Sequence, residues 1–183
     1  MEHAANQTID AKDDIQFVTL GIDQEVFGVP VETVEEILDI RPVFRVPDAP
    51  VYLAGLIDVR GRGVPVIDLR VKLGLPAIAA TANTRIVVLQ IALNGRSLLL
   101  GLIADRVFEV ATINAQHINP PPDIGVKWRS DYIKGVAHRG DGFVIIFDLV
   151  RLFSTDEIAV LGRTASRNSD AASAQPDSQA AMA

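Results

Sequence analysis

The sequence predicts an all-β protein made of two similar small barrels. Three observations lead to this fold class. Short apolar runs recur along the chain and are separated by turn residues, which is typical of sandwiches and barrels. Helical patterns are few and short. One set of residues recurs at a near-constant spacing, which indicates that a single structural unit is used twice.

The first half of the chain contains three predicted strands. The runs IQFVTLGI (residues 15–22) and EVFGVPV (residues 25–31) flank Asp23-Gln24. An aspartate in this place favours a tight turn, so we expect the two runs to form a hairpin. The third run, GVPVIDL, covers residues 63–69.

The second half repeats this pattern. The runs RIVVLQIAL (residues 85–93) and RSLLLGLIA (residues 96–104) flank Asn94-Gly95. Asn-Gly between apolar runs is the strongest short hairpin signal, because both central residues of the turn need a positive φ. GFVIIFDL, residues 142–149, is a further strand. A capping-box pattern at residues 154–157 predicts a C-terminal helix over about 155–161.

The internal repeat involves residues of several kinds. A shift of 73 places Phe27-Gly28-Val29 on Leu100-Gly101-Leu102, and a shift of 80 places Tyr52, Gly55 and Asp68 on Tyr132, Gly135 and Asp148. Two near-constant shifts in the same order predict two copies, at roughly 15–80 and 81–150. Each copy would hold about five strands and close into a small barrel, which removes free sheet edges.

Composition excludes several classes of function. Hydrophobic residues make up 49% of the chain and charged residues 22%, as in globular domains. The net charge of -6 argues against binding to nucleic acid and to anionic membrane surfaces. The chain has no cysteine, which excludes disulfides, thiolate nucleophiles and zinc sites built on sulfur.

The two ends differ from the middle in composition. Residues 1–14 and 163–183 are polar and rich in small residues, so they would bury too little apolar surface to offset the entropy of ordering. We expect flexible ends around a folded part at 15–162. The N-terminus lacks the basic and apolar regions of a signal peptide, and no apolar run approaches the roughly 20 residues that span a bilayer. We therefore expect a soluble cytoplasmic protein.

No catalytic, cofactor or metal site is predicted. Gly61-x-Gly63 lacks the Lys and hydroxyl of a phosphate-binding loop and does not open a helix. No G-x-S-x-G nucleophile motif occurs. The three histidines lie in unrelated contexts, without the convergent ligands that a metal needs. Asp68 and Asp148 could be an acid–base pair, but their equivalent places in the repeat favour bonds to local backbone N–H groups.

Two segments carry candidate interaction residues. In the acidic run around Glu36, a helical turn would place Val34 and Ile37 on one side. Core packing is the simpler interpretation of Ile37, whereas for Val34 core packing and partner contact are equally favoured.

The second segment is GLIDVRGRGVPVIDLR, residues 55–70, where flanking glycines allow a tight turn with positive φ. Arg60 on such a turn would project its planar guanidinium group into solvent, as a protein–protein anchor does. Arg62 is interpreted as a solubilising charge.

Three stretches together resemble the CheW-like domain of bacterial chemotaxis coupling proteins. They are GLIDVRGRGVPVIDLR, the upstream FGVPVETVEEIL and the downstream YIKGVAHRGDGFVIIFDLVRLF, in the order of the family. The resemblance covers about residues 15–160. It implies two intertwined five-stranded SH3-like β-barrels with short helices. It also implies a non-enzymatic adaptor that couples the cytoplasmic tip of a chemoreceptor to the regulatory domain of a CheA-type histidine kinase.

The same resemblance implies a partner-binding site. Arg60 and Gly61 match the family's Arg-Gly turn, the turn after Gly55 lies along the receptor, and Val34 with Glu36 matches a partner-contacting pair on the short helix. The chain departs from the family at Asp58, where Asn is more usual, and at Gly63, where an apolar residue is more usual. The resemblance implies no cofactor and no membrane insertion. A scaffold of a non-flagellar pathway such as twitching motility, and a small ligand-binding β-barrel, remain alternatives.

Overall fold

The computed structural model describes residues 13–93, 95–121, 130–153, 156–157 and 159–163. The predicted flexible ends lie almost wholly outside these residues. At the boundaries, Asp14 already belongs to the first strand, and residues 156–157 and 159–163 are helical. The predicted C-terminal helix is thus helical wherever it is described. Its capping-box residues 154 and 155 lie outside the described part.

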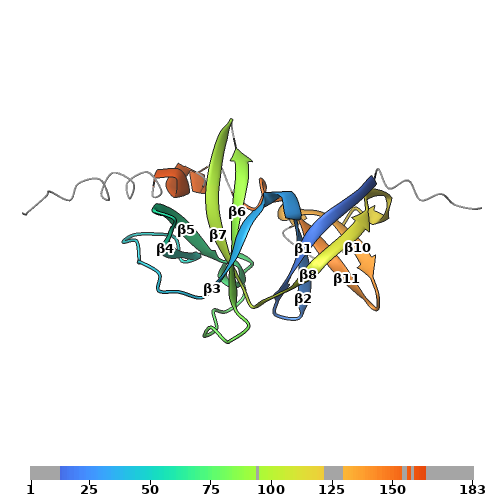
Figure 1. Cartoon of the computed structure of the whole chain (residues 1–183), viewed down its shortest axis with the longest axis horizontal. Helices are drawn as coiled ribbons and strands as arrows, with labels where there is room; N and C mark the ends of the chain where they lie inside the picture. The colour runs from blue at the N-terminus through green and yellow to red at the C-terminus, as the bar shows by residue number, and fades with distance from the viewer. Residues whose placement is uncertain (1–12, 94, 122–129, 154–155, 158, 164–183) are drawn as a thin grey trace, which may run out of the picture.

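Eleven strands form two sheets in the described residues, so the predicted all-β class is confirmed. One sheet has the order β8-β1-β2-β11-β10-β9 and the other β3-β6-β7-β5-β4. The six-stranded sheet contains β1 (Asp14–Ile22), β2 (Glu25–Pro30), β8 (Arg106–Asn114), β9 (Ile118–Asn119), β10 (Ile133–Arg139) and β11 (Gly142–Phe147). The five-stranded sheet contains β3 (Val34–Asp39), β4 (Leu53–Val59), β5 (Arg62–Asp68), β6 (Arg85–Leu93) and β7 (Arg96–Ala104). Figure 1 shows the two sheets side by side, each curled into a barrel.

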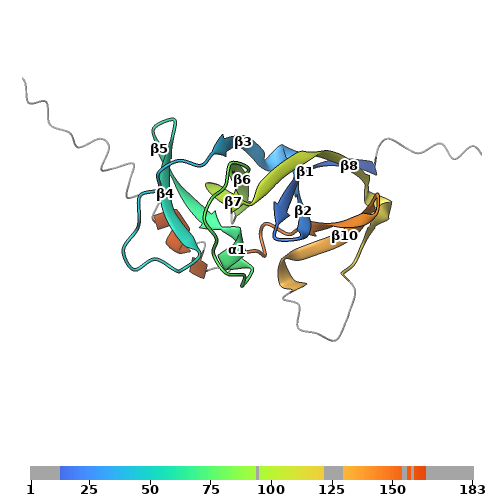
Figure 2. The same cartoon turned by 90° about the horizontal axis from the view of Figure 1, so that it is seen from below.

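Both predicted hairpins form. β1 and β2 are antiparallel with Ile22 opposite Glu25, and β6 and β7 are antiparallel with Leu93 opposite Arg96. Asn94 itself lies outside the described residues. A short helix, α1 (Leu69–Lys72), follows β5. In Figure 2 it lies between the two barrels.

The repeat appears in the strand pairing. β2 pairs in parallel with β11, and its counterpart β7 pairs in parallel with β5. β1 pairs antiparallel with β8, as β6 does with β3. Each sheet therefore takes the opening hairpin of one copy and the remaining strands of the other. The sequence halves 15–80 and 81–150 do not correspond to the two barrels, because strands are exchanged between them.

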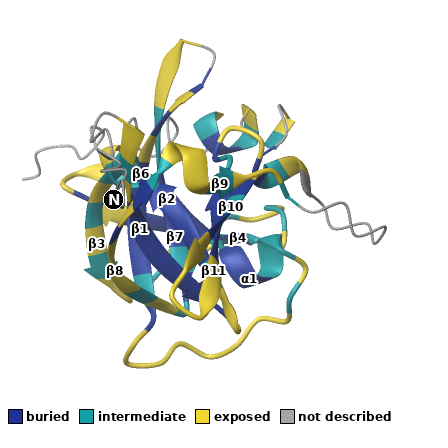
Figure 3. Ribbon diagram, turned by 90° about the vertical axis from the view of Figure 1, so that its right-hand side faces the viewer, coloured by how far each residue is buried: buried dark blue, intermediate teal, exposed yellow. Residues whose placement is uncertain are grey.

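The core has one shared part and one part inside each barrel. The shared cluster joins Leu20 and Phe147 of the six-stranded sheet to Leu89 and Leu100 of the five-stranded sheet. Separate clusters fill the two barrels, around Ile146 and Val66 respectively. Figure 3 shows the buried residues on the central strands and the exposed residues mainly on outer strands and loops. The barrels are thus packed against each other through apolar side chains.

Candidate partner-binding site

The β4–β5 hairpin ends in the tight turn that the sequence predicts. Val59 lies opposite Arg62, which leaves a two-residue loop of Arg60 and Gly61. Their φ angles are 54° and 79°, as a type I′ turn requires. The Asp58 carboxylate accepts a hydrogen bond from the backbone N–H of Gly61 at 3.0 Å. This turn raises the Arg60 side chain into solvent, where it is 76% exposed.

Arg60 lies beside Glu36, which the sequence places 24 residues earlier. The Arg60 Nε and Glu36 Oε1 atoms are 3.7 Å apart. Glu36 belongs to β3 and Arg60 follows β4, and these strands lie at opposite ends of the five-stranded order. Curling of the sheet into a barrel therefore brings them together. An exposed ion pair of this kind contributes at most about 1 kcal/mol, so Arg60 can exchange Glu36 for another carboxylate at little cost.

Val34 and Glu36 lie on a strand, which corrects the expectation of a short helix there. The helical part is a single 3₁₀ turn at Val31–Thr33, and β3 begins directly after it. Pairing of β3 with β6 supplies ladder hydrogen bonds, and its β-branched residues suit that ladder. A β-bulge between Val34 and Glu36 breaks the period of two, because Val34 lies opposite Leu89 and Glu36 opposite the adjacent Val88. Val34 and Glu36 therefore point to opposite faces of the sheet.

The expected core packing of Ile37 is wrong, because Ile37 is 43% exposed. Val34 and Ile37 do lie on one face, although no helix forms, since they are opposite Leu89 and Val87 of β6. Val34, in contrast, is partly buried against the shared core cluster.

Gly55 is a buried part of the site. Its φ is +145°, and a Cβ atom there would lie 2.2 Å from the carbonyl oxygen of Phe44. Phe44 and Leu56 exchange two backbone hydrogen bonds of 2.8 Å each across this contact. Gly55 is thus needed for the close approach of two backbone segments, and it shapes the site from within.

Asp68 and Asp148 have the structural role that the repeat predicts. Asp68 accepts a hydrogen bond from the Val71 N–H at 3.2 Å, and Asp148 accepts one from the Arg151 N–H at 3.1 Å. Each carboxylate therefore stabilises the turn that follows its strand. Within the described part of the chain, no group of three or more His, Cys, Asp or Glu side chains is placed to hold a metal ion.

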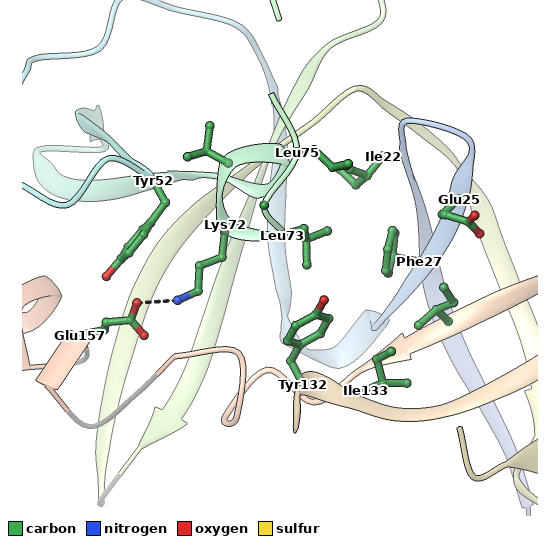
Figure 4. A pocket seen from close by; sticks show the side chains of 13 residues that line it. Ile22, Glu25, Phe27, Tyr52, Lys72, Leu73, Leu75, Tyr132, Ile133 and Glu157 are labelled. Atoms are coloured by element: carbon green, nitrogen blue, oxygen red, sulfur yellow. Dashed lines mark hydrogen bonds and ion pairs between the residues drawn. The ribbon is translucent and has the colours of Figure 1, made fainter. Parts of the chain in front are cut away.

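Sequence reasoning missed a groove of about 790 Å³ between the barrels (Figure 4). Phe27, Tyr132 and Ile133 line one end of it, and Tyr52 and Lys72 line the other. The Lys72 ammonium lies 2.5 Å from a Glu157 carboxylate oxygen and 4.4 Å from the centre of the Tyr52 ring. Burial, with a hydrogen bond and the charge of Glu157, raises the pKa of Tyr52.

The polar side chains at the Tyr52 end of this groove therefore bind one another. They do not converge on a point in the groove, as a small-ligand site would require. The groove has no local sequence signal, because its walls come from both repeats. Separately, none of the helices in the described ranges is long and apolar enough to cross a membrane.

Fold and site together define a protein-interaction module of two intertwined SH3-like barrels. The family model for the CheW-like domain matches residues 16–157. The chain is 29% identical to the chemotaxis protein CheW of Klebsiella aerogenes, over 82% of this chain and 88% of that protein. It is 28% identical to the chemotaxis protein CheW of Treponema pallidum, over 81% and 88%. The crystal structure of the scaffolding protein TtCheW from Thermoanaerobacter tengcongensis superposes with a TM-score of 0.69, at 29% identity, over 78% of this chain and 94% of that one.

The chain belongs to the CheW-like family. Its function is that of a chemotaxis signal-transduction adaptor. The family expectation drawn from the three sequence stretches is thus confirmed, as is the two-barrel fold.

Proposed function

We propose that this protein is a cytoplasmic, non-enzymatic adaptor that couples the tip of a chemoreceptor to the regulatory domain of a CheA-type histidine kinase. Membership in the CheW-like family supports the proposal. The observation that carries it is the exposed Arg60 on a rigid turn beside Glu36. The turn fixes the backbone from which this guanidinium projects, and the planar guanidinium suits a carboxylate on a partner.

The receptor-binding surface consists of Val34, Glu36, Arg60 and Gly61. Glu36 and Arg60 supply charges of both signs. Val34, which is partly buried and lies two residues before Glu36 on β3, supplies an apolar contact. Asp58 and Gly55 contribute indirectly. Asp58 holds the turn through Gly61, and Gly55 lets the Phe44 backbone approach β4.

Charge reversal at the turn tests this surface. Arg60→Glu removes an interface charge and places a carboxylate beside Glu36. Loss of one partner of a desolvated pair costs about 2 to 5 kcal/mol, which weakens a complex roughly thirtyfold to several-thousandfold. The fold should persist, because a surface charge change usually alters stability by less than about 0.5 kcal/mol. Binding to a receptor fragment would be titrated calorimetrically, with thermal melts of each variant.

Arg62→Glu, two residues further on, is the matched control. It makes the same charge change on the same hairpin but is assigned no contact, so its effect on receptor affinity should be much smaller. Equal affinity of Arg60→Glu and the parent would contradict the proposed surface. A melting temperature far below that of the parent would instead assign Arg60 to the stability of the fold.

A further inference from the structure

Arg70 is the only arginine or lysine buried in the described residues. It lies on α1, and its side chain is 9% exposed. Nη1 donates to the Asp105 carboxylate at 2.6 Å, and Nη2 donates to the Asp23 carboxylate at 3.2 Å. Nε donates to the carbonyl oxygen of Pro76 at 3.0 Å. All three guanidinium nitrogens are thus engaged.

These contacts join the two barrels. Arg70 follows β5 of the five-stranded sheet, whereas Asp23 lies in the β1–β2 turn of the six-stranded sheet. Asp105 lies where the chain passes from β7 in one sheet to β8 in the other. The Asp105 carboxylate also accepts the backbone N–H of Asp23 at 2.7 Å. We call the three charged residues Arg70, Asp23 and Asp105 the inter-barrel clamp.

The clamp occurs at one of the two crossings between the barrels. The repeat shifts place Arg70 on Val150 and Asp105 on Glu32, at the crossing from β2 to β3. Val150 is 51% exposed and Glu32 is exposed. A valine cannot form an ion pair, so the second crossing has no counterpart of the Arg70 guanidinium. The clamp is therefore a specific feature of one copy and not a consequence of the repeat.

We propose that Arg70 is a positioning residue that fixes the orientation of one barrel relative to the other. The shared apolar core holds the barrels together, but apolar burial is non-directional. A planar guanidinium that donates to three acceptors is directional, and charge-assisted hydrogen bonds are stronger than neutral ones. Burial by itself lowers the pKa of Arg70, but hydrogen bonds and charges from Asp105 and Asp23 outweigh it and raise the pKa. The Arg70 guanidinium thus stays charged in ordinary buffers.

This inference rests on the proposed function in one respect. An adaptor that binds a receptor and a kinase together must hold its contact surfaces at a fixed angle. The Arg70 side chain is only 9% exposed, so we expect it to touch neither partner. It would affect assembly only by fixing the orientation of the two barrels. We expect loss of the clamp to leave binding of each single partner unchanged and to reduce formation of the complex with both partners.

The test measures the distance between the barrels directly. Because the chain has no cysteine, spin labels attach only at introduced sites. Ala92 on β6 and Thr112 on β8 are small, exposed and on different sheets. In the labelled Ala92→Cys/Thr112→Cys protein, double electron–electron resonance should give one narrow distance distribution. Arg70→Met and Asp105→Asn should each broaden or shift that distribution.

Further variants test whether the effect depends on the guanidinium group of Arg70. Arg70→Lys should not restore the narrow distribution, because an ammonium group lacks the planar fork. Arg151→Met removes an exposed arginine from its ion pair with Asp148, three residues away in the sequence, and should leave the distribution unchanged. If Arg70→Met does not fold, Asp23→Asn provides the milder change. Asp23 is half exposed and supplies one of the two carboxylates, so a partial broadening is expected.

A distribution that stays narrow in the folded Arg70→Met or Asp23→Asn protein would overturn the proposal, even if the melting temperature falls. Unchanged assembly of the two-partner complex by a broadened variant would overturn the functional part. A parent protein that binds neither partner would contradict the proposed function instead. The distance measurement needs no partner, so the two failures are distinguishable.

Discussion

Gly55 and Gly135 occupy equivalent places in the two repeats and have the same physical role. A Cβ at Gly55 would lie 2.2 Å from the Phe44 carbonyl oxygen, and one at Gly135 would lie 2.8 Å from the Asn119 carbonyl oxygen. In both cases a neighbouring segment pairs with the residue that follows the glycine, Leu56 or Val136. Matching glycines in the sequence thus mark the same close approach of two backbones.

We expect Gly55→Ala to destabilise the protein. The new methyl group would collide with backbone atoms, and the φ of +145° is unfavourable for alanine. Backbone strain of this kind costs about 1 to 3 kcal/mol, and each kcal/mol lowers the melting temperature by roughly 2 to 4 °C at this chain length. Gly61→Asn is the control, because a Cβ at Gly61 would meet nothing within 4 Å beyond its chain neighbours and Asn tolerates positive φ. Equal melting temperatures for parent and Gly55→Ala would refute the close-approach role.

At the scale of elements, two strands end in the same way. β5 is followed by Asp68-capped α1, and β11 is followed by a turn that Asp148 holds. The backbone N–H of each aspartate in turn donates to a tyrosine carbonyl, Tyr52 or Tyr132. One local arrangement therefore serves both barrels, and the matched aspartates are best explained by hydrogen bonding.

Asp68→Ala and Asp148→Ala should destabilise the protein by similar amounts. Removing a side-chain cap costs about 0.5 to 2 kcal/mol. Asp68→Asn and Asp148→Asn keep an acceptor oxygen and should cost clearly less. Urea unfolding curves of the four variants would measure the difference. If the Asn variants lost as much stability as the Ala variants, charge would matter more than hydrogen bonding at these positions.

At the scale of the whole molecule, the exchange of strands makes the two barrels interdependent. The six-stranded sheet needs β1 and β2 from the first half of the chain, and the five-stranded sheet needs β6 and β7 from the second. Neither half contains all the strands of either sheet. Folding of both barrels therefore requires both halves at once.

Cleaving the chain in the exposed segment after α1 tests this interdependence. Fragments 1–80 and 81–183 should each be unfolded alone, because each would expose strand edges and the shared core. Mixed together, they should regain the circular dichroism spectrum and a cooperative melt. A stable, cooperatively folded single fragment would show that one half forms its own barrel and would contradict the exchange.

Features that rest on local interactions were predictable from the sequence. Turn chemistry predicted a hairpin at Asp23-Gln24 and a tight turn at Arg60-Gly61, and both form. The repeat predicted two barrels and the role of Asp68 and Asp148. These signals are readable because turns, caps and apolar alternation depend on residues a few positions apart. Three motif stretches were sufficient to indicate the family.

Contacts between segments that are distant in the sequence depend on the tertiary structure. It made residues 34–39 a strand, because pairing with β6 outweighed an acidic run that is equally compatible with a helical turn. It placed Glu36 beside Arg60, and it exchanged the hairpins between the barrels. It also gathered Asp23 and Asp105 around Arg70 from positions 47 and 35 residues away. Such contacts arise from burial and directional bonding across the whole fold, and no local pattern in the chain encodes them.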